Sequence, residues 1–264
     1  MDPVLGFLLG LIQGVAEWVP VSSKGMVGLA ASWAGVDDWL PLAFFLHLGT
    51  LVAVVIRMRA DVRDVLVGLP RWRTDRLVQF VVGATLVSLP FGFIGVVLLQ
   101  DALDRYDVTG LLATVLIGAF LIVTGLVLRT SRKHVGERGV AGTGTRDWVI
   151  MGLAQAAAVV PGLSRSGMTI SALLFQGLEP KEALRLSYVV SIPAIAGVVA
   201  YEAAFGDIWH FGAPTLAAGV LGAFVFGYVT LDVLLRAAQR VRWDLFCVAF
   251  GGAAVALGLL LMAL

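Results

Sequence analysis

Six long apolar runs constrain the fold of this chain more than any other feature of its sequence. Each run is 17–25 residues long, enough to cross about 30 Å of hydrocarbon as a helix that rises about 1.5 Å per residue. A segment in lipid must satisfy its own backbone hydrogen bonds, and the alternating pattern of a β-barrel is missing. The sequence therefore predicts six transmembrane helices, at residues 40–56, 77–99, 108–128, 186–205, 211–235 and 245–264.

The composition agrees with this interpretation. Charged residues make up only 14% of the 264 residues, hydrophobic residues make up 59%, and the mean hydropathy is +0.93. No zinc-ligand spacing, phosphate-binding P-loop or dinucleotide-binding fingerprint is present. These features argue against a soluble enzyme and against nucleic-acid binding. They predict an all-α integral membrane protein in which residues 1–264 form a single polytopic domain.

Two short segments resemble each other and differ from the six long runs. Residues 10–27 and 152–169 align without a gap and share Gly, Leu, Gln, Ser, Gly and Met at matching positions, which indicates an internal duplication. Each copy consists of two apolar pieces around a break that contains proline and glycine, and the pieces are too short to span the membrane comfortably. We therefore expect two re-entrant helix hairpins, with pieces at 4–21 and 26–34 in the first, pieces at 148–160 and 168–175 in the second, and breaks at 20–25 and 161–167.

The distribution of basic residues predicts the orientation. Of the 19 Lys and Arg residues, 16 lie on one side of the predicted spans, in segments 57–76, 129–146, 181–185 and 236–242, whereas Arg105 lies on the other side. The positive-inside rule predicts that the side with these 16 basic residues faces the cytoplasm. Three predicted spans separate the hairpins, so the hairpins enter from opposite faces. This pattern predicts two inverted repeats, approximately residues 4–130 and 146–264, with a site near the midplane where they meet.

The two remaining cations, Lys24 and Arg165, lie in the hairpin breaks. An ionisable residue inside a membrane protein indicates a functional site, and cations beside hydroxyl groups and the N-termini of short helices favour an anion site. Arg165 can bind a phosphate through two N–H groups, while Lys24 acts as a point charge. The alternative is that Arg165 pairs with Glu17 only to hold the hairpins together.

Both breaks resemble the signatures of a known family. The first signature is an acidic residue or Gln, any three residues, Glu, an aromatic residue, an apolar residue and then Pro-Val-Ser-Ser, and residues 13–23 fit it. The second signature is PGxSRSGxT, and residues 161–169 match it at every fixed position. The flanking segments 46–55 and 182–195 fit as well. The chain resembles the undecaprenyl-pyrophosphate phosphatases, also called bacitracin-resistance proteins, over essentially its whole length.

The resemblance implies that the protein hydrolyses a polyprenyl diphosphate to the monophosphate, recycling the lipid carrier for cell-envelope glycan synthesis. It also implies a requirement for Mg²⁺ or Ca²⁺ and a location in the cytoplasmic membrane, with the active site open to the outer face. The family's essential glutamate, serine and arginine correspond to Glu17, Ser23 and Arg165. The candidate substrate-binding residues are Ser22, Lys24, Ser164, Ser166, Gly167 and Thr169.

Two positions depart from the family pattern. Met26 stands where the family usually has a histidine, and Gln13 stands at the first acidic position. Gln13 and Glu17 are the candidate metal ligands. Methionine cannot transfer protons. Three outcomes follow: Ser23 and Glu17 suffice, His47 supplies the missing imidazole from the neighbouring span, or the protein does not hydrolyse its ligand.

The residues also leave open a protein of a different class. A polyprenyl-phosphate binding protein or transporter would use the same midplane anion site without hydrolysis, since inverted repeats are also what alternating access requires. Small residues at 219, 222, 223 and 227 permit close helix contact, either within the chain or in a homodimer. Glu202 and Asp232 lie near the ends of their spans, so we expect their carboxylates at the membrane interface.

Overall fold

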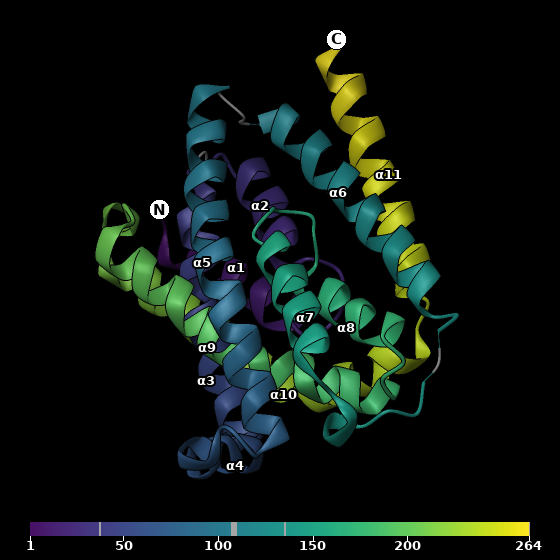
Figure 1. Ribbon diagram of the computed structural model, residues 1–264. Coiled ribbons are helices and arrows are strands. Elements are labelled where there is room, and N and C mark those ends of the chain that lie inside the picture. Colours follow the sequence, from purple (N-terminus) through teal and green to yellow (C-terminus); the bar gives the residue numbers. More distant parts are fainter. Residues whose placement is uncertain (37, 107–109, 135, 264) are drawn as a thin grey trace.

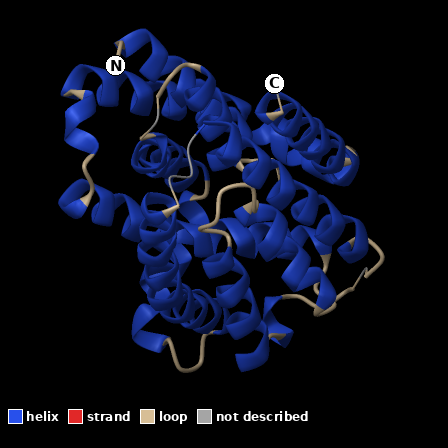
Figure 2. Ribbon diagram, turned by 90° about the horizontal axis from the view of Figure 1, so that it is seen from above, coloured by secondary structure: helices blue, strands red, loops and turns tan. Residues whose placement is uncertain are grey.

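The computed structural model describes residues 1–36, 38–106, 110–134 and 136–263. Figure 2 shows helices joined by loops, and none of the described residues forms a named strand. Short 3₁₀ turns occur at Leu69–Arg71, Val140–Gly142 and Ile208–Phe211. The α-helices are α1 (Pro3–Ala16), α2 (Ser23–Trp33), α3 (Trp39–Arg57), α4 (Arg59–Gly68), α5 (Arg76–Arg105), α6 (Gly110–Ser131), α7 (Thr145–Ala157), α8 (Arg165–Phe175), α9 (Pro180–Phe205), α10 (Ala213–Arg240) and α11 (Trp243–Met262).

Six helices in the described part of the chain are long and apolar enough to cross a membrane, namely α3, α5, α6, α9, α10 and α11. The prediction of an all-helical multi-pass protein is therefore confirmed. Several helices extend past their apolar runs, because the run marks only the part that lipid can cover. Thus α9 begins at Pro180, where proline fits the first helical turn, rather than at 186. The predicted limits at 108 and 264 lie outside the described residues.

Four shorter helices, α1, α2, α7 and α8, occupy the two predicted hairpins. Their predicted limits were wrong at the breaks, since α1 ends at Ala16 rather than 21, and α2 and α8 begin at Ser23 and Arg165 rather than 26 and 168. The reason is local chemistry. The Ser22 and Ser164 side chains accept hydrogen bonds from backbone N–H groups of the first turns of α2 and α8, so residues that read as loop instead cap the helices.

Helix pairs from the two halves of the chain pack closely. The most extensive contacts are α1 on α10, α6 on α11, and α7 on α5, and Figure 1 shows α6 and α11 running side by side. A Cβ added to Gly10 would lie 2.0 Å from the Gly219 carbonyl oxygen, so α1 and α10 can approach this closely only through small residues. The small-residue pattern of α10 is thus used within the chain.

The basic loops gather at one end of the molecule. Figure 1 places α4 at the lower end and the C-terminus at the upper end. Near the lower end, Asp232 pairs with Arg57 at 2.8 Å, with both side chains about half exposed, as expected for an interfacial carboxylate. The corresponding expectation for Glu202 was wrong. Its side chain is fully buried near the C-terminal end of α9, and it lies 3.5 Å from the Gln100 amide nitrogen. The side chain is buried because it packs inward against α5.

Candidate active site

The two hairpin breaks meet inside the helix bundle, and each supplies one charge. Glu17 directly follows α1, where Pro20 prevents the helix from continuing, and Arg165 is the first residue of α8. The Ser22 hydroxyl accepts a hydrogen bond from the Gly162 N–H at 3.0 Å, which ties one break to the other. Ser22 has a left-handed backbone with φ of 61°, uncommon for a residue with a side chain.

Gly162 shows why the second break requires glycine. Its φ is +96°, and an added Cβ would lie 2.4 Å from the carbonyl oxygen of Ile117 in α6. No other residue fits this position without displacing the backbone of α6. The Gly162 carbonyl also accepts a hydrogen bond from Thr124 at 3.0 Å, so α6 holds the break from both sides.

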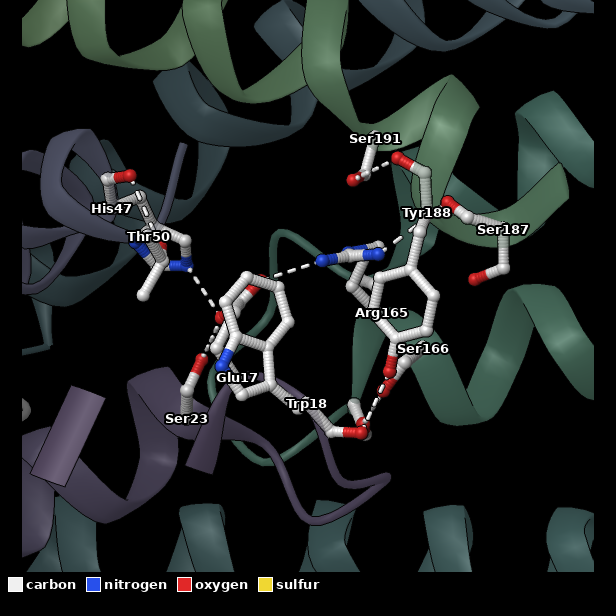
Figure 3. Close-up of polar contacts among 12 residues, drawn as sticks. Glu17, Trp18, Ser23, His47, Thr50, Arg165, Ser166, Ser187, Tyr188 and Ser191 are labelled. Carbon is white, nitrogen blue, oxygen red and sulfur yellow. Dashed lines mark hydrogen bonds and ion pairs between the residues drawn. The ribbon is translucent and has the colours of Figure 1, made fainter. Parts of the chain in front are cut away.

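Glu17 is the centre of the polar cluster. Its Oε1 accepts a hydrogen bond from the Arg165 guanidinium at 2.5 Å, and its Oε2 accepts from Ser23 Oγ at 2.6 Å and Gln13 Nε2 at 2.9 Å. His47 Nε2 lies 3.3 Å from the same Oε2. Figure 3 shows the carboxylate between His47 on one side and Arg165 on the other. The side chain of Glu17 is buried, which strengthens these charge-assisted bonds.

The ion pair that sequence reasoning offered as a structural alternative therefore exists. It joins the first hairpin to the second, and both residues are largely buried. The same two residues line a cavity, however, so the pair lies where a ligand can reach it. A structural and a functional role are compatible here.

His47 comes from α3 and approaches Glu17 with a defined ring orientation. Its Nδ1 lies 2.7 Å from the Ala43 carbonyl oxygen, while Nε2 faces the carboxylate. Both ring nitrogens thus face oxygen acceptors, and the ring can donate to both only when both nitrogens carry a proton. The structure brings His47 into the cluster, as one of the three outcomes for the missing family histidine requires.

Met26 lies elsewhere. It packs in a hydrophobic cluster with Val19, Leu121 and Cys247, which involves α6 and α11, and it lines neither of the two cavities at the polar cluster. A histidine at position 26 would stand among apolar groups. The loss of the family histidine therefore does not leave a gap beside Glu17.

Lys24 is held at the end of α7. Its ammonium donates to the Ala158 carbonyl oxygen at 2.6 Å and lies 5.3 Å from the centroid of the Phe44 ring. A cation at the C-terminal end of a helix is favoured by the helix dipole, and the aromatic face adds a cation–π interaction. Two of the three ammonium hydrogens stay available for a ligand.

A cavity of about 300 Å³ extends from this cluster. Glu17, Lys24, His47 and Arg165 form its charged end, and the rest of the wall is largely apolar and comes mainly from α5, α9 and the end of α7, with Phe44 from α3. Leu89 and Phe93 in this wall are also exposed on the surface of the protein. The cavity thus joins a buried charged end to an apolar mouth.

The predicted substrate-binding hydroxyls lie behind the charged end. Ser22, Ser23, Ser164 and Ser166 line a separate void of about 20 Å³ between the breaks, which also touches Glu17 and Arg165. That volume is about the size of one water molecule. Gly167 and Thr169 line neither cavity. The Gly167 N–H donates to Ser164, and Thr169 Oγ1 lies 2.7 Å from Ser187 Oγ and donates to the Arg165 carbonyl at 2.8 Å.

The donor set for a divalent cation is incomplete in the protein itself. Among the described residues, no group of three His, Cys, Asp or Glu side chains could hold a metal ion, and Glu17 is the only carboxylate that lines the large cavity. Gln13 turns its NH₂ group toward Glu17, and its Oε1 has no hydrogen-bond partner. Rotating the Gln13 amide by half a turn would place Oε1 beside the Glu17 carboxylate. Both oxygen ligands could then bind the same cation.

Sequence reasoning missed the residues that surround the cluster. Tyr188 in α9 contacts both breaks. Gln155 and Ser88 form a buried hydrogen bond of 3.0 Å in the cavity wall. A signal existed for Gln155, because it occupies the same place in the second repeat as Gln13 in the first. Tyr188 lies in the segment 182–195 that fits the family, but nothing in the sequence distinguished it from its apolar neighbours.

The fold and the site define a polytopic membrane protein that buries a cluster of opposite charges at the closed end of an apolar cavity. Its family is shown by comparison with known proteins. The profile of bacitracin resistance protein BacA matches residues 6–256, so the chain belongs to this family.

Proteins named undecaprenyl-diphosphatase are similar to this chain over nearly their full lengths. One from Methanothrix thermoacetophila is 38% identical over 97% of this chain and 97% of its own length. Another from Haloarcula marismortui is 38% identical over 98% of this chain and 99% of its own length. A third from Desulfosudis oleivorans is 37% identical over 98% of this chain and 100% of its own length.

Proposed function

We propose that this protein hydrolyses undecaprenyl diphosphate, or a similar polyprenyl diphosphate, to the monophosphate and inorganic phosphate. The single observation that carries the proposal is the meeting of Glu17 and Arg165, from two separate breaks, at the charged end of an apolar cavity, with Ser23 hydrogen-bonded to Glu17 from the small void behind that end. Family membership and relatives named undecaprenyl-diphosphatase support it. The product is the lipid carrier that envelope glycan synthesis reuses.

The cavity suits a lipid diphosphate as a substrate. The diphosphate would enter the charged end, where Arg165 and Lys24 attract its oxygens, and the first isoprene units would lie along the apolar wall. The rest of the tail would leave past Leu89 and Phe93, which are exposed on α5, a helix long and apolar enough to cross a membrane. A tail far longer than the cavity can thus stay in the bilayer during the reaction.

The proposed site opens to the outer face of the cell membrane. The parts of α5 and α9 that line the cavity run from the middle of each helix toward the Arg105 and Phe205 ends. These ends are opposite the loops that carry most of the basic residues, which the positive-inside rule places in the cytoplasm. A carrier released on the outer face by glycan transfer would therefore reach the site directly.

Ser23 and Glu17 form the hydrogen-bonded pair that nucleophilic catalysis requires. Ser23 Oγ would attack the terminal phosphorus, its proton would pass to Glu17, and the bridging P–O bond would break with polyprenyl monophosphate as the leaving group. Arg165 would neutralise the charge that develops on the transferred phosphoryl group. Water would then attack the phosphoserine, the Ser23 O–P bond would break, and inorganic phosphate would leave as the serine regains its proton.

His47 and the remaining hydroxyls would support this reaction. His47 faces the same carboxylate oxygen as Ser23, so it can take up or supply the proton that Glu17 handles. Ser166 and Ser164 line the small void that also touches Glu17 and Arg165, so their hydroxyls lie next to the side chains that would handle the phosphoryl group. Ser22 and Thr169 shape the two breaks through their hydrogen bonds.

We propose that a divalent cation, Mg²⁺ or Ca²⁺, arrives together with the diphosphate. Glu17 and the amide oxygen of Gln13 supply too few ligands alone, and the substrate oxygens would complete the shell. When bound, the cation would neutralise phosphate charge. A homodimer is not needed for any of these contacts, and it would have to use a surface other than the face of α10 that α1 covers.

The experiment that tests the function measures phosphate release from undecaprenyl diphosphate by the purified protein in detergent. The assay is run with Mg²⁺, with Ca²⁺ and with a chelator, alongside Arg165→Ala. We expect metal-dependent release that Arg165→Ala abolishes. Binding of the lipid diphosphate without phosphate release would refute hydrolysis and indicate a lipid-phosphate carrier. Release that a chelator leaves unchanged would refute only the cation.

A further inference from the structure

Tyr188 is the residue of α9 that contacts both hairpin breaks at once. Its side chain is 1% exposed and lies deep in the bundle beside Trp18, with ring centroids 5.8 Å apart. Figure 3 shows its hydroxyl directed at the chain of the first break, and its ring beside the Arg165 guanidinium of the second. The family signatures at 13–23 and 161–169 do not contain it.

The hydroxyl acts on the segment that carries Glu17. Tyr188 donates a hydrogen bond of 2.6 Å to the carbonyl oxygen of Trp18, the residue next to Glu17. This carbonyl follows the end of α1, where the helix no longer supplies a partner. The indole N–H of Trp18 donates to the Gly227 carbonyl at 2.8 Å, so α9 and α10 hold the turn from two directions.

The ring acts on Arg165. The centre of the guanidinium lies 5.5 Å from the ring centroid, within the range of a cation–π interaction. Such a contact holds a guanidinium by its face and uses none of its N–H donors. One of these N–H groups binds Glu17, and a second lies 3.4 Å from the Ser187 carbonyl oxygen. The ring therefore orients Arg165 without using any of its five N–H donors, and three of them remain for phosphate beyond the two directed at Glu17 and Ser187.

We propose that Tyr188 is a positioning residue that sets how Glu17 and Arg165 lie relative to each other. Its hydroxyl holds the backbone beside Glu17, and its ring orients the Arg165 guanidinium. It acts through these two residues and does not touch the substrate. The inference rests on the proposed phosphatase function, in which Glu17 handles the proton and Arg165 binds the phosphate. The two halves of the proposal separate by substitution, because phenylalanine removes the hydroxyl alone and leucine removes the ring as well.

The test compares Tyr188→Phe and Tyr188→Leu with a matched control, Tyr228→Phe. Tyr228 lies on α10, is 45% exposed, stacks on Phe224 and lines neither cavity at the polar cluster. We expect Tyr188→Phe to lower kcat about three- to tenfold, the usual effect of one lost hydrogen bond, with KM unchanged. Tyr188→Leu should also raise KM about three- to tenfold, since Arg165 loses its cation–π support. The control should match the unmodified protein.

Folded protein is quantified for each variant by size-exclusion chromatography and thermal unfolding. A merely structural role would reduce the folded fraction and leave kcat and KM of that fraction unchanged, and this result overturns the proposal. If Tyr188→Phe and Tyr188→Leu changed KM equally, that result would overturn the role of the ring. An unchanged kcat in Tyr188→Phe would overturn the role of the hydroxyl.

A binding measurement keeps this proposal separate from the phosphatase function. The affinity for undecaprenyl diphosphate is measured for Tyr188→Leu in the presence and in the absence of Arg165→Ala. If the ring acts through Arg165, leucine weakens binding only while the arginine is present. Equal weakening in both backgrounds overturns the proposal, even for a protein that binds the lipid without cleaving it. Absence of phosphate release from the unmodified protein would refute the phosphatase function alone.

Discussion

Removing the charge of Glu17 tests whether its ion pair with Arg165 also stabilises the contact between the two hairpins. Glu17→Gln keeps the shape of the side chain but leaves the Arg165 guanidinium, with a side chain only 13% exposed, without its counter-ion. His47 and Lys24 then face the same space with no carboxylate among them. Breaking a buried ion pair by removing one partner costs about 3–5 kcal/mol.

The magnitude follows from burial. Because Arg165 keeps some exposure and Gln can still accept a hydrogen bond, we expect the lower end, a loss of about 3 kcal/mol in the free energy of unfolding. For a chain of this size, that corresponds to a fall of about 6–12 °C in Tm. Phosphate release should fall by about 10² to 10⁴, as expected when a general base is removed.

A double variant distinguishes the two effects. Glu17→Gln with Arg165→Met removes both charges and leaves two side chains of similar length. Stability should recover by about half or more, because no unpaired charge remains buried, whereas activity should stay lost. Thermal unfolding of the purified proteins in one detergent and the phosphate-release assay give the two readouts. A double variant no more stable than Glu17→Gln would show that the unpaired charge is not what destabilises the single variant.

Three further predictions concern single positions. His47→Asn should lower kcat about 10- to 100-fold if the imidazole handles a proton with Glu17, measured at saturating substrate; an unchanged kcat would return His47 to a packing role. Gly162→Ala should destabilise the protein by about 2 kcal/mol or more, because its φ and its contact with Ile117 exclude a Cβ, whereas Gly252→Ala, where nothing lies within 4 Å, is the stable control in thermal unfolding. Ala194→Trp should fill the apolar part of the cavity and raise KM about tenfold or more while kcat changes little, since the lost contacts are remote from the phosphates; an unchanged KM would place the tail elsewhere.

The sequence predicts the architecture well because lipid imposes simple rules. Six apolar runs and the proline-glycine breaks follow from backbone satisfaction in hydrocarbon, and each run corresponds to a helix. Helix starts at the breaks could not be predicted as well. Ser22 and Ser164 read as loop residues, yet their hydroxyls cap α2 and α8. Capping depends on the local backbone, which hydropathy does not report.

The site was predictable where it carries charge and hidden where it does not. Glu17, Lys24 and Arg165 are conspicuous in an apolar sequence, and the structure gathers all three at one cavity. Tyr188 stands in an ordinary apolar run, and its importance depends on which helices pack together, whereas Gln155 was marked only by its match to Gln13 in the first repeat. Glu202 shows the same limit in reverse, since its place near the end of a span indicated the interface whereas packing buries it.

The ion pair links substrate binding to catalysis in the proposed reaction. Among the residues that the structure describes, the ion pair gives Arg165 of the second hairpin its only carboxylate at the cavity, so burying Arg165 depends on Glu17 of the first hairpin. A diphosphate that enters the cavity offers Arg165 a second anion. As the guanidinium turns to the phosphate, Glu17 loses one partner and keeps Ser23, whose proton it then accepts more readily. The contact that joins the two breaks is therefore the one that the substrate would displace, and its displacement would activate the base only when the phosphate has arrived.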